Sequence, residues 1–293
     1  MEIRIRPHTP ADVPDIARIL FDAFQSIAER HHFPLDFPTR EVAGQAAGLF
    51  ARHPNVFGVV AEADGRVVGS NFLDERDAIR AVGPITVDPA FHGRGVGRRL
   101  MEAVIDRGRG RAAAGAAAGV RLVQDAFNTT SMSLYASLGF DAKEPLALMS
   151  GTPRGGAPDG AQTRAMTEAD LPACAALCHR VHGIDRTNEL RDAVRMFGAT
   201  VLTRGDRVTA YASAPDFWVM NHGVGESDAD LIGTLAGASA GSGKPVTLLV
   251  PIRRAAFFRG LLSAGLRVVK PMTLMAMGQY QEPAGAFYPS VGY

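Results

Sequence analysis

A glycine- and arginine-rich run over residues 87–104, VDPAFHGRGVGRRLMEAV, is well suited to hold an anion. Three glycines fall on alternate positions: Gly93, Gly95 and Gly97. Three arginines lie in the same run: Arg94, Arg98 and Arg99. The run leads into a helical pattern, and the first N–H groups of a helix lack helical partners and attract negative charge. We therefore predict a pyrophosphate cradle. The alternative is a tight turn that needs glycine only for its shape.

Two familiar phosphate motifs fit this run poorly. A Rossmann fingerprint needs Gly-x-Gly-x-x-Gly in a parallel βαβ unit, with an acidic residue about 20 positions on. Here the glycines are spaced two and two, and Asp125 comes too late. The Gly-Lys-Ser/Thr of a P-loop is missing from the run.

A second group of polar residues lies in NTTSMSLYASLGF, residues 128–140. Asn128, Ser131 and Tyr135 have the i, i+3, i+7 spacing that places side chains on one helix face. The alternative is that Asn128 is only an N-cap and Tyr135 only a packing residue.

Strands and helices must position these two segments. We expect strands over residues 2–6, on both sides of the turn Asp64-Gly65, and over 81–88, 120–127 and 140–150. We expect helices over residues 10–29, 39–51, 96–107 and 128–138, with a loose helix end or loop at 112–119. The strand–glycine turn–helix order places the cradle at a helix start.

The two segments resemble the signature segments of the GCN5-related N-acetyltransferases (GNAT), over about residues 3–149. The family pattern Arg/Gln-x-x-Gly-x-Gly/Ala corresponds to residues 92–97, and His92 departs from the usual Arg or Gln. The resemblance implies an α/β (α+β) fold with a mixed, mostly antiparallel sheet flanked by helices. It also implies acetyl-CoA as co-substrate, and we expect no metal.

The resemblance further implies roles for individual residues. Backbone groups of Ile85, Thr86 and Val87 would stabilise the developing oxyanion and pair with the pantetheine arm. Tyr135 would protonate the leaving sulfur, and Asn128 would hold the arm. The expected cofactor-binding set is Ile85, Thr86, Val87, His92, Gly93, Arg94, Gly95, Val96, Gly97, Arg98, Asn128 and Ser131.

The sequence does not identify a general base. Family members often carry Glu on the strand before the Asn, but Val123 stands there. Carboxylate candidates are Glu75, which we take as a weak catalytic candidate, and Asp74 and Asp125. Three more candidates lie in the loop after the first helix, a region that commonly shapes the acceptor pocket in this family: His31, His32 and Asp36.

The chain contains an internal repeat. RPHTPADVPDIARIL from Arg6 and RAMTEADLPACAALC from Arg164 share Arg-x-x-Thr-x-Ala-Asp-apolar-Pro, and each contains a near capping box. A Gly- and Pro-rich segment between them is typical of a flexible linker. We predict two tandem acetyltransferase-like domains: residues 1–150, a linker at 151–163, and residues 164–293.

The second copy lacks the residues expected to do chemistry. We align the two copies by matching AGL, residues 264–266, to LGF, residues 138–140. In this alignment Arg254 replaces Asn128 and Leu261 replaces Tyr135. Acidic and polar residues replace the glycine loop, and their charge repels a pyrophosphate: Glu226, Ser227, Asp228 and Asp230. We expect a non-catalytic domain, with the tail FYPSVGY, residues 287–293, plugging or covering a sheet edge.

Composition limits the remaining function classes. The 293 residues carry a net charge of +1, which gives no electrostatic argument for nucleic acid or membranes as partners. The two cysteines, Cys174 and Cys178, are spaced as core residues of one helix, and no signal peptide or membrane span is recognisable, so we expect a cytoplasmic protein.

The predicted function is acetyl transfer to an amine of an unidentified acceptor, either a small molecule or a protein; the sequence also allows a homodimer. Two alternatives remain open. One is a sensor that binds an acyl-CoA or metabolite without turnover, and the other is a structural partner whose repeats serve assembly.

Overall fold

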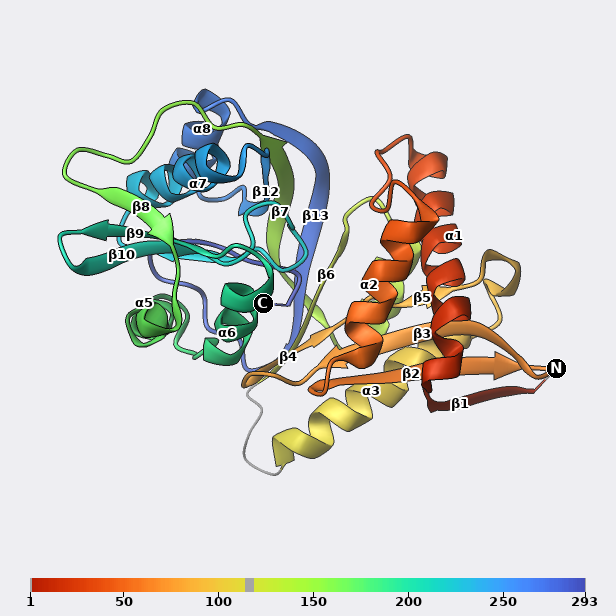
Figure 1. Cartoon of the computed structure of the whole chain (residues 1–293). Coiled ribbons are helices and arrows are strands. Elements are labelled where there is room, and N and C mark those ends of the chain that lie inside the picture. Colours follow the sequence, from red (N-terminus) through yellow and green to blue (C-terminus); the bar gives the residue numbers. More distant parts are fainter. Residues whose placement is uncertain (1, 114–118, 293) are drawn as a thin grey trace. The chain divides into compact units, whose positions relative to one another are not determined.

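The computed structural model describes residues 2–113 and 119–292, which form two compact units (Figure 1). The first unit contains Met1–Leu122 and Phe127–Phe140, and the second contains Val123–Ala126 and Asp141–Tyr293. The division therefore differs from the expected domain end at residue 150. No helix within the described ranges is long and apolar enough to cross a membrane.

The first unit follows the expected order of elements closely. Its helices are η1 (Pro10–Asp12), α1 (Val13–His31), α2 (Arg40–Arg52), η2 (Pro89–Phe91), α3 (Val96–Ala113) and α4 (Thr129–Ser137). Its strands are β1 (Ile3–Pro7), β2 (Val56–Ala63), β3 (Arg66–Asp74), β4 (Ile79–Val82), β5 (Thr86–Val87) and β6 (Gly119–Asp125), whose last residues belong to the second unit. Of the expected loose segment at 112–119, residues 114–118 lie outside the described residues.

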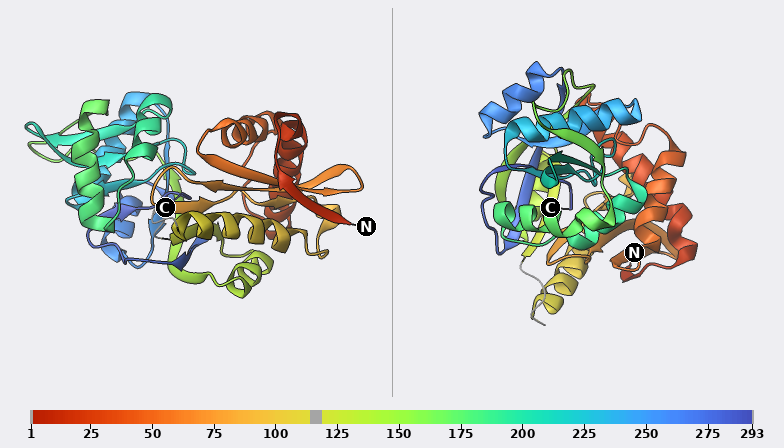
Figure 2. Two further views of the ribbon diagram at one scale, coloured as in Figure 1. Left: turned by 90° about the horizontal axis from the view of Figure 1, so that it is seen from below. Right: turned by 60° about the vertical axis from the view of Figure 1, so that its left-hand side comes forward.

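The sheet of the first unit has the strand order β1–β2–β3–β4–β6, with β5 beside β3. Its neighbours are antiparallel except for β4 and β6. Helices α1 and α2 cover one face and α3 covers the other (Figure 2). The apolar stripe predicted for α3 is buried in this arrangement: Leu100, Met101, Val104 and Ile105.

The strand expected over residues 81–88 is interrupted. Strand β4 runs parallel to β6 as far as the pair Ala81 and Arg121, and β5 begins again at Thr86 as a partner of β3. Residues 83–85 belong to neither strand. The interruption leaves β5 with β3 as its one strand partner among the residues that the structure describes.

The second unit repeats most of this order, without counterparts of β4 and η2. Its helices are η3 (Glu168–Asp170), α5 (Leu171–His182), α6 (Thr187–Met196), α7 (Asp228–Ser242) and α8 (Ala255–Ser263). Its strands are β7 (Asp141–Gly151), β8 (Gln162–Ala165), β9 (Thr200–Arg204), β10 (Arg207–Ala212), β11 (Gly223–Gly225), β12 (Val246–Pro251), β13 (Arg267–Gly278) and β14 (Ala286–Tyr288).

The strands of the second unit pair in two groups. One sheet has the order β14–β11–β10–β9–β8, and its pairs are all antiparallel. Strand β7 lies between β12 and β13 and is antiparallel to both. This pairing explains the revised boundary, because residues 141–150 find both of their strand partners in the second half of the chain.

The repeated Arg-x-x-Thr motif builds the same helix start in both units. Thr9 and Asp12 form a capping box, as do Thr167 and Asp170. In each copy the repeated arginine donates two hydrogen bonds to the carboxylate, at 2.8 and 2.9 Å from Arg6 and at 2.7 and 2.7 Å from Arg164. The near capping boxes predicted from the sequence are therefore confirmed, and the repeated arginine has a structural reason.

The segment expected to be a flexible linker is packed against α7. It joins the end of β7 at Gly151 to the start of β8 at Gln162. A Cβ on Gly233 of α7 would lie 2.6 Å from Pro158 Cδ and 3.2 Å from Ala157 Cα. Glycine and proline therefore permit a close, irregular packing here rather than a loose connection.

Candidate functional site

The glycine loop between η2 and α3 has the backbone shape that requires glycine at two positions. Gly93 and Gly95 have φ values of 74° and 79°, in the left-handed region that side chains disfavour. A Cβ on either glycine would meet no atom within 4 Å, so the space next to this backbone is open. Gly97 differs, because it lies in α3 and a Cβ there would contact Leu134 at 3.5 Å. The turn shape therefore accounts for Gly93 and Gly95, and no side chain fills the exposed space beside them.

The first turn of α3 presents backbone donors to that space. Arg99 N donates to Gly95 O at 3.2 Å, so the N–H groups of Val96, Gly97 and Arg98 precede the first helical hydrogen bond. The first turn contains no acidic residue. A helix start with these donors favours a bound anion.

The arginines of the loop differ in their surroundings. Arg98 is exposed and donates to Ser137 Oγ at 2.7 Å, which ties the start of α3 to the end of α4. Arg94 lies over the Phe91 ring at 5.4 Å. Arg99 donates to the carbonyl of Ile3 in β1, so its charge is directed away from the loop. Two of the three arginines therefore remain beside the glycines.

Strand β5 offers backbone groups on the side opposite β3. Asp88 N donates to Val68 O at 2.9 Å, and N–H directions alternate along a strand. The N–H and C=O of Val87 therefore point away from β3. His92 Nε2 donates to this Val87 carbonyl at 3.1 Å. His92 therefore stands where Arg or Gln is usual in the resembling family, and its ring ties the loop to β5. The N–H of Val87 remains available.

Helix α4 carries the second predicted group of residues. Asn128 Oδ1 accepts a hydrogen bond from Ser131 N at 3.2 Å, so the asparagine is the N-cap of α4. Tyr135 is buried on α4, with its ring 6.4 Å from the Phe140 ring. The neighbouring Leu134 faces Gly97 at the start of α3. The structure therefore brings α4 beside the first turn of α3, as the proposed site requires.

A cation holds three of the four carboxylates considered as a base: Asp74, Glu75 and Asp125. Half-buried Asp74 forms an ion pair with Arg76, and Asp125 lies 2.7 Å from Lys270 Nζ, with Asp125 and Lys270 both buried. Glu75 accepts two hydrogen bonds of 3.0 Å from Arg107. Arg107 lies eleven residues beyond the start of α3, about 16 Å along the helix. The structure therefore does not bring Glu75 to the end of α3 where Tyr135 lies.

The loop after α1 approaches the start of α4 through aromatic contacts that the sequence analysis missed. Phe33 stacks on Phe127 with ring centroids 4.2 Å apart, and the His31 ring lies 5.1 Å from the same phenylalanine. Phe127 directly precedes the cap residue Asn128. Among the three loop candidates, His31 lies against Phe127 next to the start of α4, whereas His32 is exposed and Asp36 is half-buried. Nothing in the local spacing signals a pair so far apart in the chain.

The two cysteines are poor candidates for nucleophiles. Both are buried and free in α5, as expected for core residues. Burial raises the pKa of the Cys174 thiol to about 12 and that of Cys178 to about 11, so both stay protonated near neutrality.

Residues 13–140 match the model of the acetyltransferase (GNAT) family. This range contains the glycine loop, β5 and α4, so the match covers every element of the candidate site. The first unit is a GNAT acetyltransferase domain. Membership of the family supports acyl transfer as the general activity, while no curated protein sequence matches the chain.

Solved structures extend the likeness over the whole chain. A Pyrococcus horikoshii protein classed among the acetyltransferases covers 99% of this chain and 94% of its own, with a TM-score of 0.75 and 17% identity. A GCN5-related N-acetyltransferase from Sphaerobacter thermophilus covers 97% and 98%, with a TM-score of 0.63 and 18% identity. A tandem GNAT protein from the clavulanic acid biosynthesis pathway covers 94% and 98%, with a TM-score of 0.59 and 12% identity. At these identities the likeness establishes the fold, which has the tandem arrangement predicted from the sequence.

Proposed function

We propose that the first unit transfers an acetyl group from acetyl-CoA to an amine of a small molecule or protein. The observation that supports this most directly is the convergence of three elements of the GNAT domain. The open glycine loop, the outward N–H of Val87 in β5 and the C-terminal half of α4 all lie around the first turn of α3.

Residues of this region fit the parts of acetyl-CoA. The N–H groups of the first turn of α3 and the side chains of Arg94 and Arg98 would hold the pyrophosphate. The backbone of residues 85–87 would hold the pantetheine arm, with Asn128 and Ser131 at the start of α4. The open space beside Gly93 and Gly95 supports this fit, because a side chain there would fill the cradle.

Bound acetyl-CoA would supply a thioester whose carbonyl carbon accepts the amine. The backbone N–H of Val87 would donate to the carbonyl oxygen as negative charge develops on it. A C–N bond forms and the C–S bond breaks, and Tyr135 donates its phenolic proton to the leaving sulfur. The tyrosinate then recovers a proton from water. The attacking nitrogen passes its extra proton to water. Three of the candidate bases, Asp74, Glu75 and Asp125, are ion-paired.

Calorimetric titration of acetyl-CoA tests the placement of the cradle. Gly95→Glu puts a negative side chain into the open space, and we expect it to abolish measurable binding. Gly65→Glu is a matched control, because Gly65 has a φ of 77° and its Cβ would also meet nothing within 4 Å. It makes the same change of charge and backbone strain at the β2–β3 turn of the same unit. Equal affinity in both variants would refute the placement.

Turnover separates the enzyme from the sensor. The ion pairing of Asp74, Glu75 and Asp125 is the observation that favours a sensor without turnover. We expect release of free thiol from acetyl-CoA in the presence of at least one member of a panel of amines, and loss of that release in Gly95→Glu. Tight binding without acceptor-dependent thiol release from any amine would favour the sensor instead.

A further inference from the structure

The second unit contains a strand that has no counterpart in the first. Each unit places a short strand after its central hairpin and before a helix: β5 before α3, and β11 before α7. Strand β5 pairs with β3, and β11 pairs with the equivalent β10. The other edge of β11 is occupied, because β14 pairs with it in the register Gly223 to Tyr288 and Gly225 to Ala286. The tail of the chain therefore covers this edge of β11, whereas the equivalent edge of β5 has no strand beside it among the described residues.

We propose that residues 286–288 are a built-in ligand of the second unit, held in the position that the cofactor arm takes in the first. The comparison with the cofactor arm rests on the proposed function, whereas the docking of the tail does not. Three sets of contacts carry the inference.

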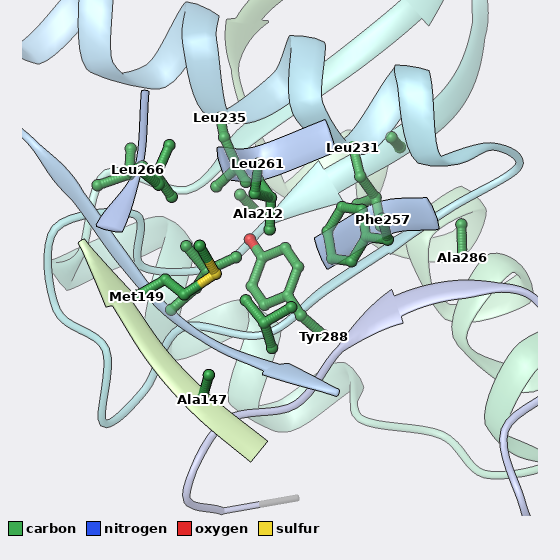
Figure 3. Packing of buried hydrophobic residues seen from close by; sticks show 14 of the residues in the cluster. Ala147, Met149, Ala212, Leu231, Leu235, Phe257, Leu261, Leu266, Ala286 and Tyr288 are labelled. Atoms are coloured by element: carbon green, nitrogen blue, oxygen red, sulfur yellow. The ribbon is translucent and has the colours of Figure 1, made fainter. Parts of the chain in front are cut away.

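The first set is the fit of Tyr288 against β11. A Cβ on Gly223 would lie 2.3 Å from Cε1 of the Tyr288 ring, so the glycine makes room for that ring. The tyrosine is fully buried, and its hydroxyl donates to Asn221 Oδ1 at 3.1 Å. Figure 3 shows the ring surrounded by apolar side chains from several elements, which include Met149, Ala212 and Phe257. The tail is thus part of the core rather than a surface strand.

The second set involves Arg254, the residue that replaces Asn128. Arg254 and Asn128 are the N-caps of α8 and α4 and have similar backbone angles, with φ −79° and ψ 67° against φ −83° and ψ 77°. Arg254 donates to the carbonyl of Gly285 at the start of the tail strand, and its guanidinium lies 5.5 Å from the Phe287 ring. The position assigned to cofactor binding in the first unit therefore holds the tail in the second.

The third set lies at the start of α7, where the first unit has its cradle. Arg254 also donates to Asp228, the first residue of α7, at 2.6 Å. Ser227 caps this helix through Asp230 N, so its first N–H groups are partly satisfied from within the chain. A nearby open cavity of about 1000 Å³ contains Arg180 and Arg207, but both pair with Glu226. Charges and donors that could serve a pyrophosphate are thus already used.

Amide hydrogen exchange on the whole chain tests the proposal. We expect the amides within residues 286–288 that donate to β11 to exchange as slowly as those of β10, because they belong to one sheet. In Gly223→Ala a methyl group would press on the Tyr288 ring, and we expect these amides to exchange about tenfold to a hundredfold faster, from the usual cost of overpacking a core. Gly241→Ala in α7 is the matched control, since a Cβ there meets nothing within 4 Å.

Two further measurements keep the proposal falsifiable if Gly223→Ala fails to fold. Tyr288→Phe removes only the hydrogen bond to Asn221, and we expect a smaller acceleration confined to β11 and β14. Saturating acetyl-CoA should leave the exchange of residues 286–288 unchanged. Loop-like exchange in the wild type, equal effects of the two glycine variants, or displacement of the tail by acetyl-CoA would each overturn the proposal. Failure of acetyl-CoA to bind anywhere would count against the proposed function but not against the docked tail.

Discussion

Tyr135 combines a buried ring with the hydroxyl proposed as general acid. Tyr135→Phe keeps the ring packed near Phe140 and removes only the proton donor. We expect kcat to fall by about 10²–10⁴-fold when chemistry limits the rate, with acetyl-CoA affinity nearly unchanged. Thiol release and calorimetry on the same preparation measure both quantities.

A purely structural role for Tyr135 gives a different pattern. The variant would then lose about 1 kcal/mol of stability from a missing hydrogen bond and keep normal turnover in the folded fraction. The melting temperature therefore has to be measured alongside kcat. Normal kcat in a folded Phe variant, with chemistry shown to be rate-limiting, would remove Tyr135 from the mechanism.

Asp170 gives a residue-level prediction for pH dependence. Hydrogen bonds from Arg164 lower the pKa of its carboxyl to about 2 in the folded chain. The unfolded chain binds this proton near pH 4, so the stabilisation is complete above about pH 4 and is lost as pH falls toward 2. Urea unfolding at a series of pH values should show a shallower loss of stability over this range in Asp170→Asn. Asp206→Asn, an exposed control in the β9–β10 turn, should keep the wild-type slope.

At the scale of elements, substitutions of Asn128 test whether this residue binds acetyl-CoA in addition to capping α4. An aspartate at this position can still accept the hydrogen bond from Ser131 N, but it cannot donate from an amide. We expect Asn128→Asp to keep the melting temperature and to raise the KM for acetyl-CoA. Asn128→Ala should lower both stability, by about 1 kcal/mol, and affinity. An unchanged KM in Asn128→Asp would limit the residue to its capping role.

Local pattern predicted most of the elements and the parts of the site that depend on one segment. The capping boxes, the turn at Asp64-Gly65 and the apolar face of α3 each follow from residues close in sequence. The glycine loop was placed at the start of α3 for the same reason. Contacts between distant segments, such as the stacking of Phe33 on Phe127, were not predicted. The residues next to Phe33 and Phe127 in the sequence give no information about which distant residue each contacts.

At the scale of the whole molecule, the two units predict one cofactor site per chain. The first has glycines before α3 and no strand on the far side of β5 among the described residues, whereas the second has a tail strand beside β11 and acidic residues in the first turn of α7. Calorimetry with acetyl-CoA should therefore give a stoichiometry of one per chain. Two equivalent sites would show that the second unit also binds the cofactor.

The domain boundary could not be read from the sequence. The Gly- and Pro-rich segment after β7 has the composition of a linker, and alternation within residues 141–151 shows only which faces are buried. Which strands lie beside β7 depends on pairing with β12 and β13, about 100 residues later in the chain. A local sequence pattern therefore does not predict which distant strands pair or in which register.

The position of β7 between β12 and β13 has a consequence for gene recombination. A gene segment that ended at residue 150 would encode a strand separated from both of its partners, β12 and β13, with two bare edges open to aggregation. The remaining segment would lack the strand between that pair. Recombination at the apparent linker would therefore yield two products that each lack strand partners, although each carries one copy of the repeated fold.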